Sequence, residues 1–316
     1  VPDRGWEDKA DILKDTLTDK EFEEARASTT DAFYTSPAPI RGIYRALEKF
    51  GFKGGKILEP AFGTGNFIGL VPESFTVSTH ITGVEKDSIS ARIGRQLYQK
   101  STVVLHNEFQ EAKLSRNYYD LAISNVPFSE VKPFDRTFNK KRLVLHDYFF
   151  NKSLELVRPG GMVAFITSAG TMDKTSTTAR KLFTEKADFV GAIRLPENTF
   201  KDSGTAVTTD IIFLRKKGGD GKKIADQKFL ETADLGSGEA DVDSLFESGG
   251  TASQVIPINK YFKNNPEMML GKMTIGSGQF GRRVGKLISD GRDLSEAIDD
   301  AIKNLPEDIY TDTNVA

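Results

Sequence analysis

The sequence predicts an α/β protein built on a doubly wound, mostly parallel seven-stranded sheet. Apolar runs typical of strands lie at 56–59, 80–85, 102–106, 119–125 and 161–167, and helical patterns separate them. Such alternation of strand and helix is typical of a parallel sheet with helices on both faces. Two further runs, 189–193 and 211–214, follow a helical stretch near 176–186 and supply the last two strands.

The segments between these strands carry their own signals. Residues 1–30 are rich in acids and lysine and predict an exposed helix that leads into the sheet. Between 39 and 50, apolar residues recur every three or four positions, which indicates an amphipathic helix packed before the first strand. A helix near 143–157 is expected to end at Arg158-Pro159-Gly160-Gly161, a cluster of helix-breaking residues before the next strand.

Changes in composition predict the domain organisation. We expect a helical N-terminal extension over 1–30 and the sheet domain over 31–217. Residues 218–254 are rich in Gly, Ser and acids and predict a linker, and 255–316 form a C-terminal tail or the start of a further module. Because the chain begins at Val1 without a methionine, we expect a processed chain or a piece of a longer protein.

Composition excludes several classes of protein. The chain has 316 residues, a formal net charge of −2 and no cysteine, so it has no thiol nucleophile, disulfide or cysteine-bound zinc. The lack of cysteine also fits the expected cytoplasmic location. His80, His106 and His146 lack the spacing of metal ligands, so no metal is expected. No apolar stretch reaches the roughly 18 residues of a membrane span, and no membrane association is expected.

A glycine turn follows the first strand. The segment 57–67 joins an apolar run to a helix start, which is where a doubly wound sheet binds a nucleoside cofactor. Gly63 and Gly65 let the backbone approach a ligand closely. Glu85 ends the second strand, where a carboxylate accepts from ribose hydroxyls. Because no GxGxxG is present, the pattern favours S-adenosylmethionine over a nicotinamide or flavin cofactor.

The four residues Asn125-Val126-Pro127-Phe128 directly follow an apolar run and have the chemistry to hold an amine. The lone pair of an exocyclic amine is delocalised into its ring, which makes the amine a weak nucleophile. The side-chain oxygen of Asn125 and the carbonyl of Val126 can accept both of its N–H groups and draw the nitrogen toward sp³ geometry. Pro127 fixes the turn, and Phe128 can stack on an extruded ring.

With these motifs in this order, the chain resembles the N6-adenine DNA methyltransferases of the gamma motif order. It is similar to modification subunits of type I restriction systems and to methylase modules of phage and mobile-element helicase-methylase polypeptides. The resemblance covers residues 33–215, makes 31–217 the catalytic domain, and implies a sheet closed by an antiparallel hairpin. It implies that S-adenosylmethionine is the cofactor and is contacted by Phe33, Thr35, Glu59, Pro60, Ala61, Gly63, Gly65, Glu85, Glu108, Phe109 and Asn125.

The resemblance also implies a role for each motif. Phe33 and Thr35 match the motif that precedes the glycine turn in this class and encloses the methionine part of the cofactor. Asn107-Glu108-Phe109 matches the segment that contacts the cofactor adenine, and residues 125–128 match the catalytic motif. Phe200 matches the aromatic residue that packs on the other face of the target base.

Two positions depart from the family pattern. Val126 stands where the family most often has a proline, but the group used there is a backbone carbonyl, which valine retains. Glu108 stands in place of the usual aspartate and is one methylene longer, so it keeps the carboxylate that contacts the cofactor adenine. Neither change removes a functional atom.

A run of basic residues follows Phe128 and predicts contact with DNA phosphates. Only Asp135 opposes the cations of this run, which are Lys132, Arg136, Lys140, Lys141 and Arg142. A solvated loop and helix start would explain the same charges. The net charge of −2 argues against a general basic coating but leaves room for such a local strip.

The function implied is methylation of the N6 amine of adenine in DNA, by base flipping and direct in-line transfer. Cytosine N4 methylation uses the same geometry, although Asn125 favours adenine. The alternatives are a glutamine or RNA methyltransferase with the same Asn-x-Pro-aromatic grip, and a non-catalytic cofactor-binding subunit of a restriction or antirestriction complex.

Recognition of a DNA sequence is expected to come from elsewhere. About 100 residues follow the sheet domain, which is short for a target-recognition domain. We therefore expect such a domain or a helicase module in the same polypeptide, or a partner subunit. The segment 261–271 is similar to one that follows the methylase module in the fusion polypeptides, and we expect it to cap a helix and pack in the core.

Overall fold

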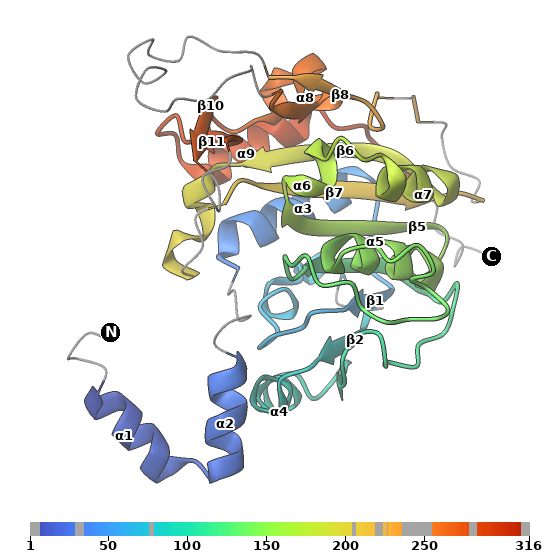
Figure 1. The fold of residues 1–316 in the computed structure, drawn as a ribbon. Helices are drawn as coiled ribbons and strands as arrows, with labels where there is room; N and C mark the ends of the chain where they lie inside the picture. Colours follow the sequence, from blue (N-terminus) through green and yellow to red (C-terminus); the bar gives the residue numbers. More distant parts are fainter. Residues whose placement is uncertain are drawn as a thin grey trace.

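The computed structural model of the protein describes residues 7–28, 35–75, 79–203, 207–218, 224–225, 227–235, 255–277 and 283–310. Seven strands form a central sheet in the order β3-β2-β1-β4-β5-β7-β6 (Figure 1). They are β1 (Lys56–Glu59), β2 (His80–Glu85), β3 (Thr102–His106), β4 (Tyr119–Asn125), β5 (Val157–Ser168), β6 (Ala187–Leu195) and β7 (Thr209–Lys216). The pairs among β1 to β5 are parallel, and β7 runs antiparallel to both β5 and β6. The predicted mostly parallel sheet with a closing hairpin is confirmed.

Helices cover both faces of this sheet (Figure 1). Those of the sheet domain are α3 (Pro37–Lys49), α4 (Ser88–Leu97), α5 (Leu145–Leu156), α6 (Gly170–Asp173) and α7 (Thr178–Lys186), with short 3₁₀ helices η1 (Ile68–Leu70), η2 (Glu73–Phe75) and η3 (Glu197–Ser203). α5 and α7 pack together on one face, whereas α3 lies on the other (Figure 1). The amphipathic pattern predicted over 39–50 is the source of α3, whose apolar side chains are buried.

The Pro159-Gly160-Gly161 cluster departs from its predicted place. The cluster was expected to lie before the fifth strand, but β5 begins at Val157 and contains all three residues. The register between β4 and β5 shifts between Tyr119 and Leu121, beside this cluster. Gly160 has φ 76°, which permits the irregular backbone. The breaker residues therefore end α5 as predicted but form an irregular strand start instead of a loop.

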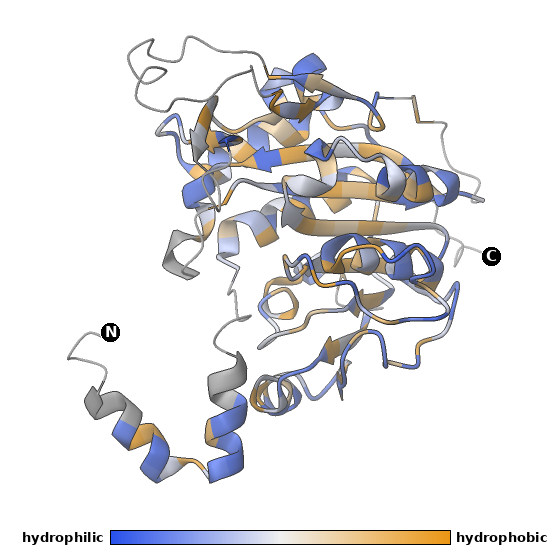
Figure 2. Ribbon diagram, viewed as in Figure 1, coloured by the Kyte–Doolittle hydropathy of each residue, from blue (hydrophilic) through white to orange (hydrophobic). Residues whose placement is uncertain are grey.

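Apolar residues concentrate in the central strands, and the N-terminal helices are mostly hydrophilic (Figure 2). Residues 119–124 of β4 are all buried, as expected for a parallel strand covered on both faces. The predicted N-terminal helix is two helices, α1 (Glu7–Thr16) and α2 (Asp19–Ser28), and Glu21 of α2 pairs with Arg92 of α4. No helix in the described ranges combines the length and the apolar composition needed to cross a bilayer.

The described residues beyond 217 pack against the sheet domain. They form α8 (Lys260–Asn264), η5 (Pro266–Met268), α9 (Leu294–Lys303) and two antiparallel pairs, β8 (Thr232–Asp234) with β9 (Pro257–Asn259) and β10 (Lys272–Ser277) with β11 (Arg283–Ile288). Ile298 of α9 is fully buried against Gly42 of α3, where an added Cβ would overlap the Ile298 side chain. Tyr310 N donates to Phe50 O (2.8 Å), and Lys49 Nζ donates to Lys303 O (2.9 Å).

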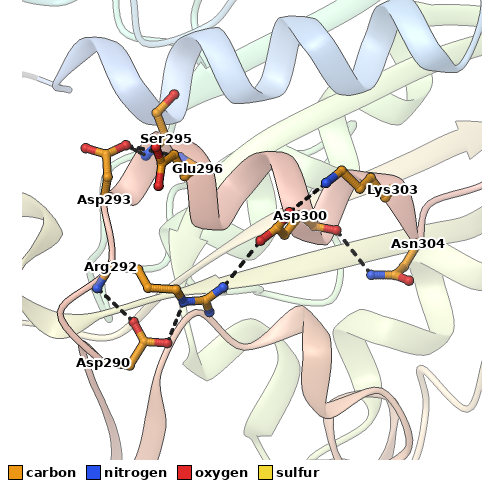
Figure 3. Close-up of polar contacts among 8 residues, drawn as sticks. All are labelled: Asp290, Arg292, Asp293, Ser295, Glu296, Asp300, Lys303 and Asn304. Carbon is orange, nitrogen blue, oxygen red and sulfur yellow. Dashed lines mark hydrogen bonds and ion pairs between the residues drawn. The ribbon is translucent and has the colours of Figure 1, made fainter.

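Local signals begin and stabilise α9 (Figure 3). The Asp293 carboxylate caps the helix by accepting from the amides of Ser295 (2.9 Å) and Glu296 (3.1 Å). Asp300 and Lys303 form an ion pair in the last turn (2.7 Å). The domain boundary predicted at residue 217 rests on motifs and composition. In the structure, described residues on both sides of residue 217 share one hydrophobic core.

We expect Ile298→Ala to lower the free energy of unfolding of the whole protein by about 2–4 kcal/mol, because a fully buried side chain is removed from the interface between α3 and α9. Chemical denaturation followed by circular dichroism measures this change. Lys303→Ala, at an exposed position of the same helix, is the control and should change stability by less than about 0.5 kcal/mol. Equal stability of both variants and the parent would show that α9 does not share the fold of the sheet domain.

Candidate functional site

A cavity of about 410 Å³ opens at the carboxyl ends of the central strands. β1 and β4 are neighbours in the sheet although β2 and β3 lie on the other side of β1, so the direction of strand order reverses between them. Ligands of doubly wound proteins bind at this kind of switch point. The cavity is lined by Pro60, Ala61, Gly63, Val84, Glu85, Lys86, Asp87, Ser90, Asn107, Glu108, Phe109, Gln110, Asn125, Val126, Pro127, Phe128, Ser129, Val131, Pro133, Leu145 and Phe149.

The glycine turn after β1 presents backbone to this cavity. Gly63 has φ 56°, and no heavy atom lies within 4 Å of the position that a Cβ would take there. Gly65 has φ 89°, but a Cβ there would overlap the rings of Phe62 and Tyr98. Gly63 therefore leaves open space for a ligand, whereas Gly65 is needed for the turn and for packing beneath it.

Two carboxyl groups of different character lie behind this turn. Glu85 accepts from the amides of Gly63 (2.6 Å) and Asp87 (2.8 Å), and burial raises the pKa of its carboxyl. Glu59 is 1% exposed, and its Oε2 atom has no hydrogen-bond partner among the described residues. Burial, with the charge of Glu85 beside it, raises the pKa of the Glu59 carboxyl well above its ordinary value. Glu85 thus lines the cavity as the hydrogen-bonding acid, whereas Glu59, also predicted to contact the cofactor, is buried and does not line it.

Asn125 ends β4 with its side-chain amide held in one orientation. Its Nδ2 atom donates to Thr35 Oγ1 (3.0 Å), and Thr35 is itself buried. Asn66 Nδ2 donates to the Thr35 carbonyl (3.3 Å) and so ties this contact to the glycine turn. The Asn125 Oδ1 atom is buried and has no hydrogen-bond partner in the described part of the chain. Because Asn125 lines the cavity, this oxygen is an acceptor available to a ligand.

The residues after Asn125 continue the cavity wall. The Val126 amide donates to Ile166 O (3.1 Å), which extends the pairing of β4 with β5 by one residue, and the Val126 side chain is buried. Pro127 and Phe128 are half-buried and line the cavity. Position 126 is a valine where the resembled family most often has a proline. The hydrogen bond to Ile166 uses the Val126 N–H group, which a proline at this position would lack.

An aromatic group forms the wall at the end of β3. Phe109 is buried, with its ring centroid 4.7 Å from that of Phe149. The Phe109 carbonyl accepts from Lys152 Nζ (2.5 Å), which fixes the backbone next to the cavity. Glu108 lines the cavity but is exposed to solvent. An apolar ring beside an acid provides a flat surface and a polar edge for a nucleobase.

Several predicted site residues lie outside this cavity. Phe200, which was predicted to pack on the other face of the target base, is 3% exposed and does not line the cavity. The reason is packing, since β11 covers its loop, with Lys286 paired to Glu197 (3.2 Å) and the Leu287 amide donating to Thr208 Oγ1 (2.9 Å). The predicted DNA contacts lie outside the cavity and are exposed to solvent; they are Lys132, Arg136, Lys140 and Lys141. Phe33 lies outside the described residues.

Other wall residues were missed by the sequence analysis. Asp87 caps α4 by accepting from the Ser90 amide (2.7 Å), and this local signal could have placed a helix start at the cavity. Leu145 and Phe149 lie one turn apart on α5 and also line the cavity. Nothing in their local sequence indicates which face of α5 is turned to the cavity. No group of three or more acidic or histidine side chains is placed to hold a metal within the described ranges.

The fold is the one found in S-adenosylmethionine-dependent methyltransferases of known structure. One solved structure with this fold is a Listeria monocytogenes protein reported as a class I S-adenosylmethionine-dependent methyltransferase, with 24% identity, TM-score 0.52, and 61% of this chain and 63% of that chain covered. Another is the methyltransferase subunit of a type I restriction-modification system from Streptococcus thermophilus, with 16% identity, TM-score 0.51, and 60% and 46% covered.

The family follows from sequence comparison. The model of the N-6 DNA methylase family matches residues 14–231, and the chain belongs to this family. The chain is also 30% identical over 190 residues to Defense against restriction protein B of Escherichia phage P1. That match spans 58% of this chain and 8% of the phage protein, so the similarity concerns a small part of a much longer polypeptide. The predicted resemblance is confirmed at the level of the family.

S-adenosylmethionine is the cofactor of this family, and the residues of the cavity fit it. The Glu85 carboxylate can accept from ribose hydroxyls, and the open space at Gly63 admits a ligand against the backbone. Phe109 and Glu108 provide the flat and polar surfaces that suit an adenine ring. The unpaired Oδ1 atom of Asn125 supplies an acceptor at the far end of the cavity.

We expect the affinity for S-adenosylmethionine to fall as the pH drops through the raised pKa of Glu85. Ribose hydroxyls bind the ionised carboxylate, so below that pKa binding must release a proton and weakens by up to about tenfold per pH unit. Calorimetric titration at several pH values measures this slope. Glu85→Gln should bind more weakly with a flatter pH profile, while Glu185→Gln on α7 should keep the parent profile. Identical profiles for the parent and Glu85→Gln would contradict this role of Glu85.

Proposed function

We propose that the chain transfers a methyl group from S-adenosylmethionine to the N6 amine of adenine in DNA. The observation that carries this proposal is the unpaired, buried Oδ1 atom of Asn125, which lines the same cavity as the glycine turn and Glu85. An unsatisfied buried acceptor costs about 1–3 kcal/mol. That cost is offset when an N–H donor of a substrate completes the site.

The grip on the amine needs two acceptors at a fixed distance from each other. In this proposal the Asn125 Oδ1 atom and the Val126 carbonyl accept the two N–H groups of the adenine amine. Thr35 holds the Asn125 amide from behind, so the oxygen and not the NH₂ group is presented to the substrate. The two acceptors localise the lone pair on nitrogen and stabilise the positive charge that develops there during transfer. The cofactor supplies an electrophilic methyl group.

Access to the amine requires that the base leave the duplex. The N6 amine of a paired adenine takes part in base pairing and cannot reach a cavity at the end of a sheet, so we propose that the base is flipped out. Phe128 lines the cavity two residues after Val126 and is placed to stack on the extruded ring. Transfer of the methyl group is then direct and in line, without a covalent intermediate on the protein. The absence of cysteine from the chain is therefore no obstacle to this reaction.

DNA is proposed as the polymer because of the charges beside the cavity. Lys132, Arg136, Lys140 and Lys141 are exposed on the loop that leaves Phe128. Asp135, the acid that opposes them in the sequence, is turned inward and accepts from the Tyr148 hydroxyl (2.7 Å). The exposed surface of residues 132–142 is therefore more cationic than their sequence suggests, which suits a phosphate backbone.

Sequence recognition is proposed to need a further part. The 190 residues matched to the phage P1 protein span 8% of that protein, and the described residues of this chain beyond 217 pack on the sheet domain. We therefore propose that a target-recognition domain or a helicase module, in the same polypeptide or in a partner subunit, selects the DNA site. Methylation by this chain alone is expected to show little preference for one sequence.

We expect Asn125→Ala to lower the rate of methyl transfer to adenine-containing DNA by roughly 10²–10³-fold, because it removes an acceptor aimed at the charge that develops on the amine. The measurement is transfer of tritiated methyl groups to DNA, followed by separation of the methylated nucleosides. Asn304→Ala, which removes an exposed amide just after the end of α9, is the control and should keep the parent rate.

Other outcomes of this assay would contradict the proposal. Label in N4-methylcytosine would change the target base. Label in protein or RNA but not DNA would favour a glutamine or RNA methyltransferase. Cofactor binding without any transfer would favour a non-catalytic subunit.

We expect Lys140→Ala and Lys141→Ala each to weaken DNA binding, because each removes a cation that can neutralise a phosphate. The plot of the logarithm of the binding constant against the logarithm of the salt concentration should become less steep by about 0.9 for each phosphate that the variant no longer neutralises. Fluorescence anisotropy over a range of salt concentrations measures this slope. Lys181→Ala, at an exposed position of α7, should leave the slope unchanged. A slope that stays at the parent value in both loop variants would remove this loop from the DNA interface.

A further inference from the structure

The loop from Phe128 to Val144 has a backbone held by inward-turned polar side chains. Asp135 accepts from the amides of Thr137 (2.8 Å) and Phe138 (2.9 Å), as well as from Tyr148 of α5. Burial would raise the pKa of the Asp135 carboxyl, but these hydrogen bonds outweigh burial and lower it. Asp135 is therefore an ionised anchor for the middle of the loop.

A second anchor closes the same loop. The Asn139 side chain donates to Pro133 O (2.9 Å) and to Leu143 O (3.1 Å), and accepts from the Leu143 amide (2.8 Å). Asn151 of α5 donates to Phe138 O (2.6 Å). With both of its sides tied to these anchors, the loop is a rigid platform on α5.

One large apolar side chain projects from this platform into solvent. Phe134 is 80% exposed, and no other large apolar side chain in the described part of the chain is as exposed. Its neighbours Pro133 and Asp135 are both hydrogen-bonded inward, and the proline ring restricts the backbone further. Phe134 therefore cannot turn into the core without breaking the anchors that hold the loop.

The surroundings of Phe134 suit a nucleic acid better than an apolar partner. The Arg136 guanidinium lies 5.7 Å from the centroid of the Phe134 ring. Lys132, Lys140 and Lys141 are exposed and form no ion pair with any described residue. A ring beside a guanidinium, on a loop that carries further exposed cations, complements a stack of bases between two phosphate backbones.

Phe134 also lies next to the cavity. Val131 and Pro133 line the cavity together with Asn125 and Phe128, and Phe134 is the following residue. Val131 is 64% exposed and extends the apolar surface from the cavity mouth toward Phe134. A base held by Asn125 would leave its gap in the duplex close to this surface.

We propose that Phe134 inserts into duplex DNA beside the target base and stacks in the gap that the extruded base leaves. This role rests on the proposed function, because it assumes that the duplex lies over the cavity. The inserted ring replaces the stacking that the neighbouring bases lose, as apolar wedges do in proteins that bend DNA. It thereby stabilises the flipped state without touching the reacting atoms, so Phe134 is a positioning residue.

The first experiment compares methylation of duplex and single-stranded DNA. In a single strand there is no gap to fill, so Phe134→Ala should lower the rate on duplex DNA by about tenfold or more and the rate on the same single strand by less than about twofold. Phe134→Trp should restore the rate on duplex DNA. Tyr118→Ala is the matched control, because Tyr118 is also an exposed aromatic residue with a cation, the Lys56 ammonium, over its ring. Tyr118 lies just before β4, at the end of that strand away from the cavity, so its replacement should leave both rates unchanged.

The second experiment measures binding and does not depend on methyl transfer. A duplex with one abasic position already contains the gap, so the parent protein should bind it more tightly than the intact duplex, and Phe134→Ala should lose most of that preference. Thermal unfolding of Phe134→Ala should match the parent, because the side chain lies in solvent. A preference for the abasic duplex that depends on Phe134 supports insertion even if the parent transfers no methyl group to DNA.

Two results would overturn the insertion of Phe134. One is an unchanged rate on duplex DNA together with an unchanged preference for the abasic duplex. The other is an equal loss of rate on duplex and single-stranded DNA, which would assign Phe134 to general contact with the chain of nucleotides. In either case methyl transfer by the parent protein would leave the proposed function in place.

Discussion

The site depends on the parallel pairing of β1 with β4 in the middle of the sheet. Right-handed crossovers lead away from these two strands in opposite directions, so the segments that follow them leave a crevice at their carboxyl ends. The glycine turn continues β1, and the residues from Asn125 to Phe128 continue β4. The Ser124 hydroxyl donates to Ala61 O (3.3 Å) and joins the two ends directly. Cofactor and substrate groups are therefore close because two strands are neighbours.

Two buried carboxyl or amide oxygens without a hydrogen-bond partner in the described ranges lie at the ends of β1 and β4. The Oε2 atom of Glu59 and the Oδ1 atom of Asn125 have no hydrogen-bond partner among the described residues. Proteins satisfy most buried polar atoms, because each unpaired one costs about 1–3 kcal/mol. At the end of a well-packed parallel sheet this cost is tolerated, and at Asn125, which lines the cavity, it keeps an acceptor ready for a ligand. Thr35 orients Asn125 by accepting a hydrogen bond from its Nδ2 atom, and the Gly63 amide orients the neighbouring Glu85 carboxylate by donating to it.

Packing contacts on both sides of the crevice hold the surrounding elements in place. On one face, α9 fills the surface of α3, and on the other side of the cavity the loop after Phe128 is tied to α5 by Tyr148 and Asn151. Both arrangements use residues that carry no chemistry in the proposed reaction. Their contribution is to hold Thr35, Asn125 and the basic loop in fixed relation, since transfer to a weak nucleophile depends on position.

The sequence by itself determined the strands, the glycine turn with Glu85, and the segment from Asn125 to Phe128. Each of these is encoded by residues adjacent in the chain, where apolar periodicity and turn chemistry act directly on the backbone. Only the tertiary structure decided that Thr35 holds Asn125 across 90 positions, that Phe200 is buried under β11, and that α9 packs on α3. It also decided that Asp135 turns inward while Phe134 projects outward. Such contacts join segments distant in the chain, and which side chains meet depends on how the crossovers and the core place those segments.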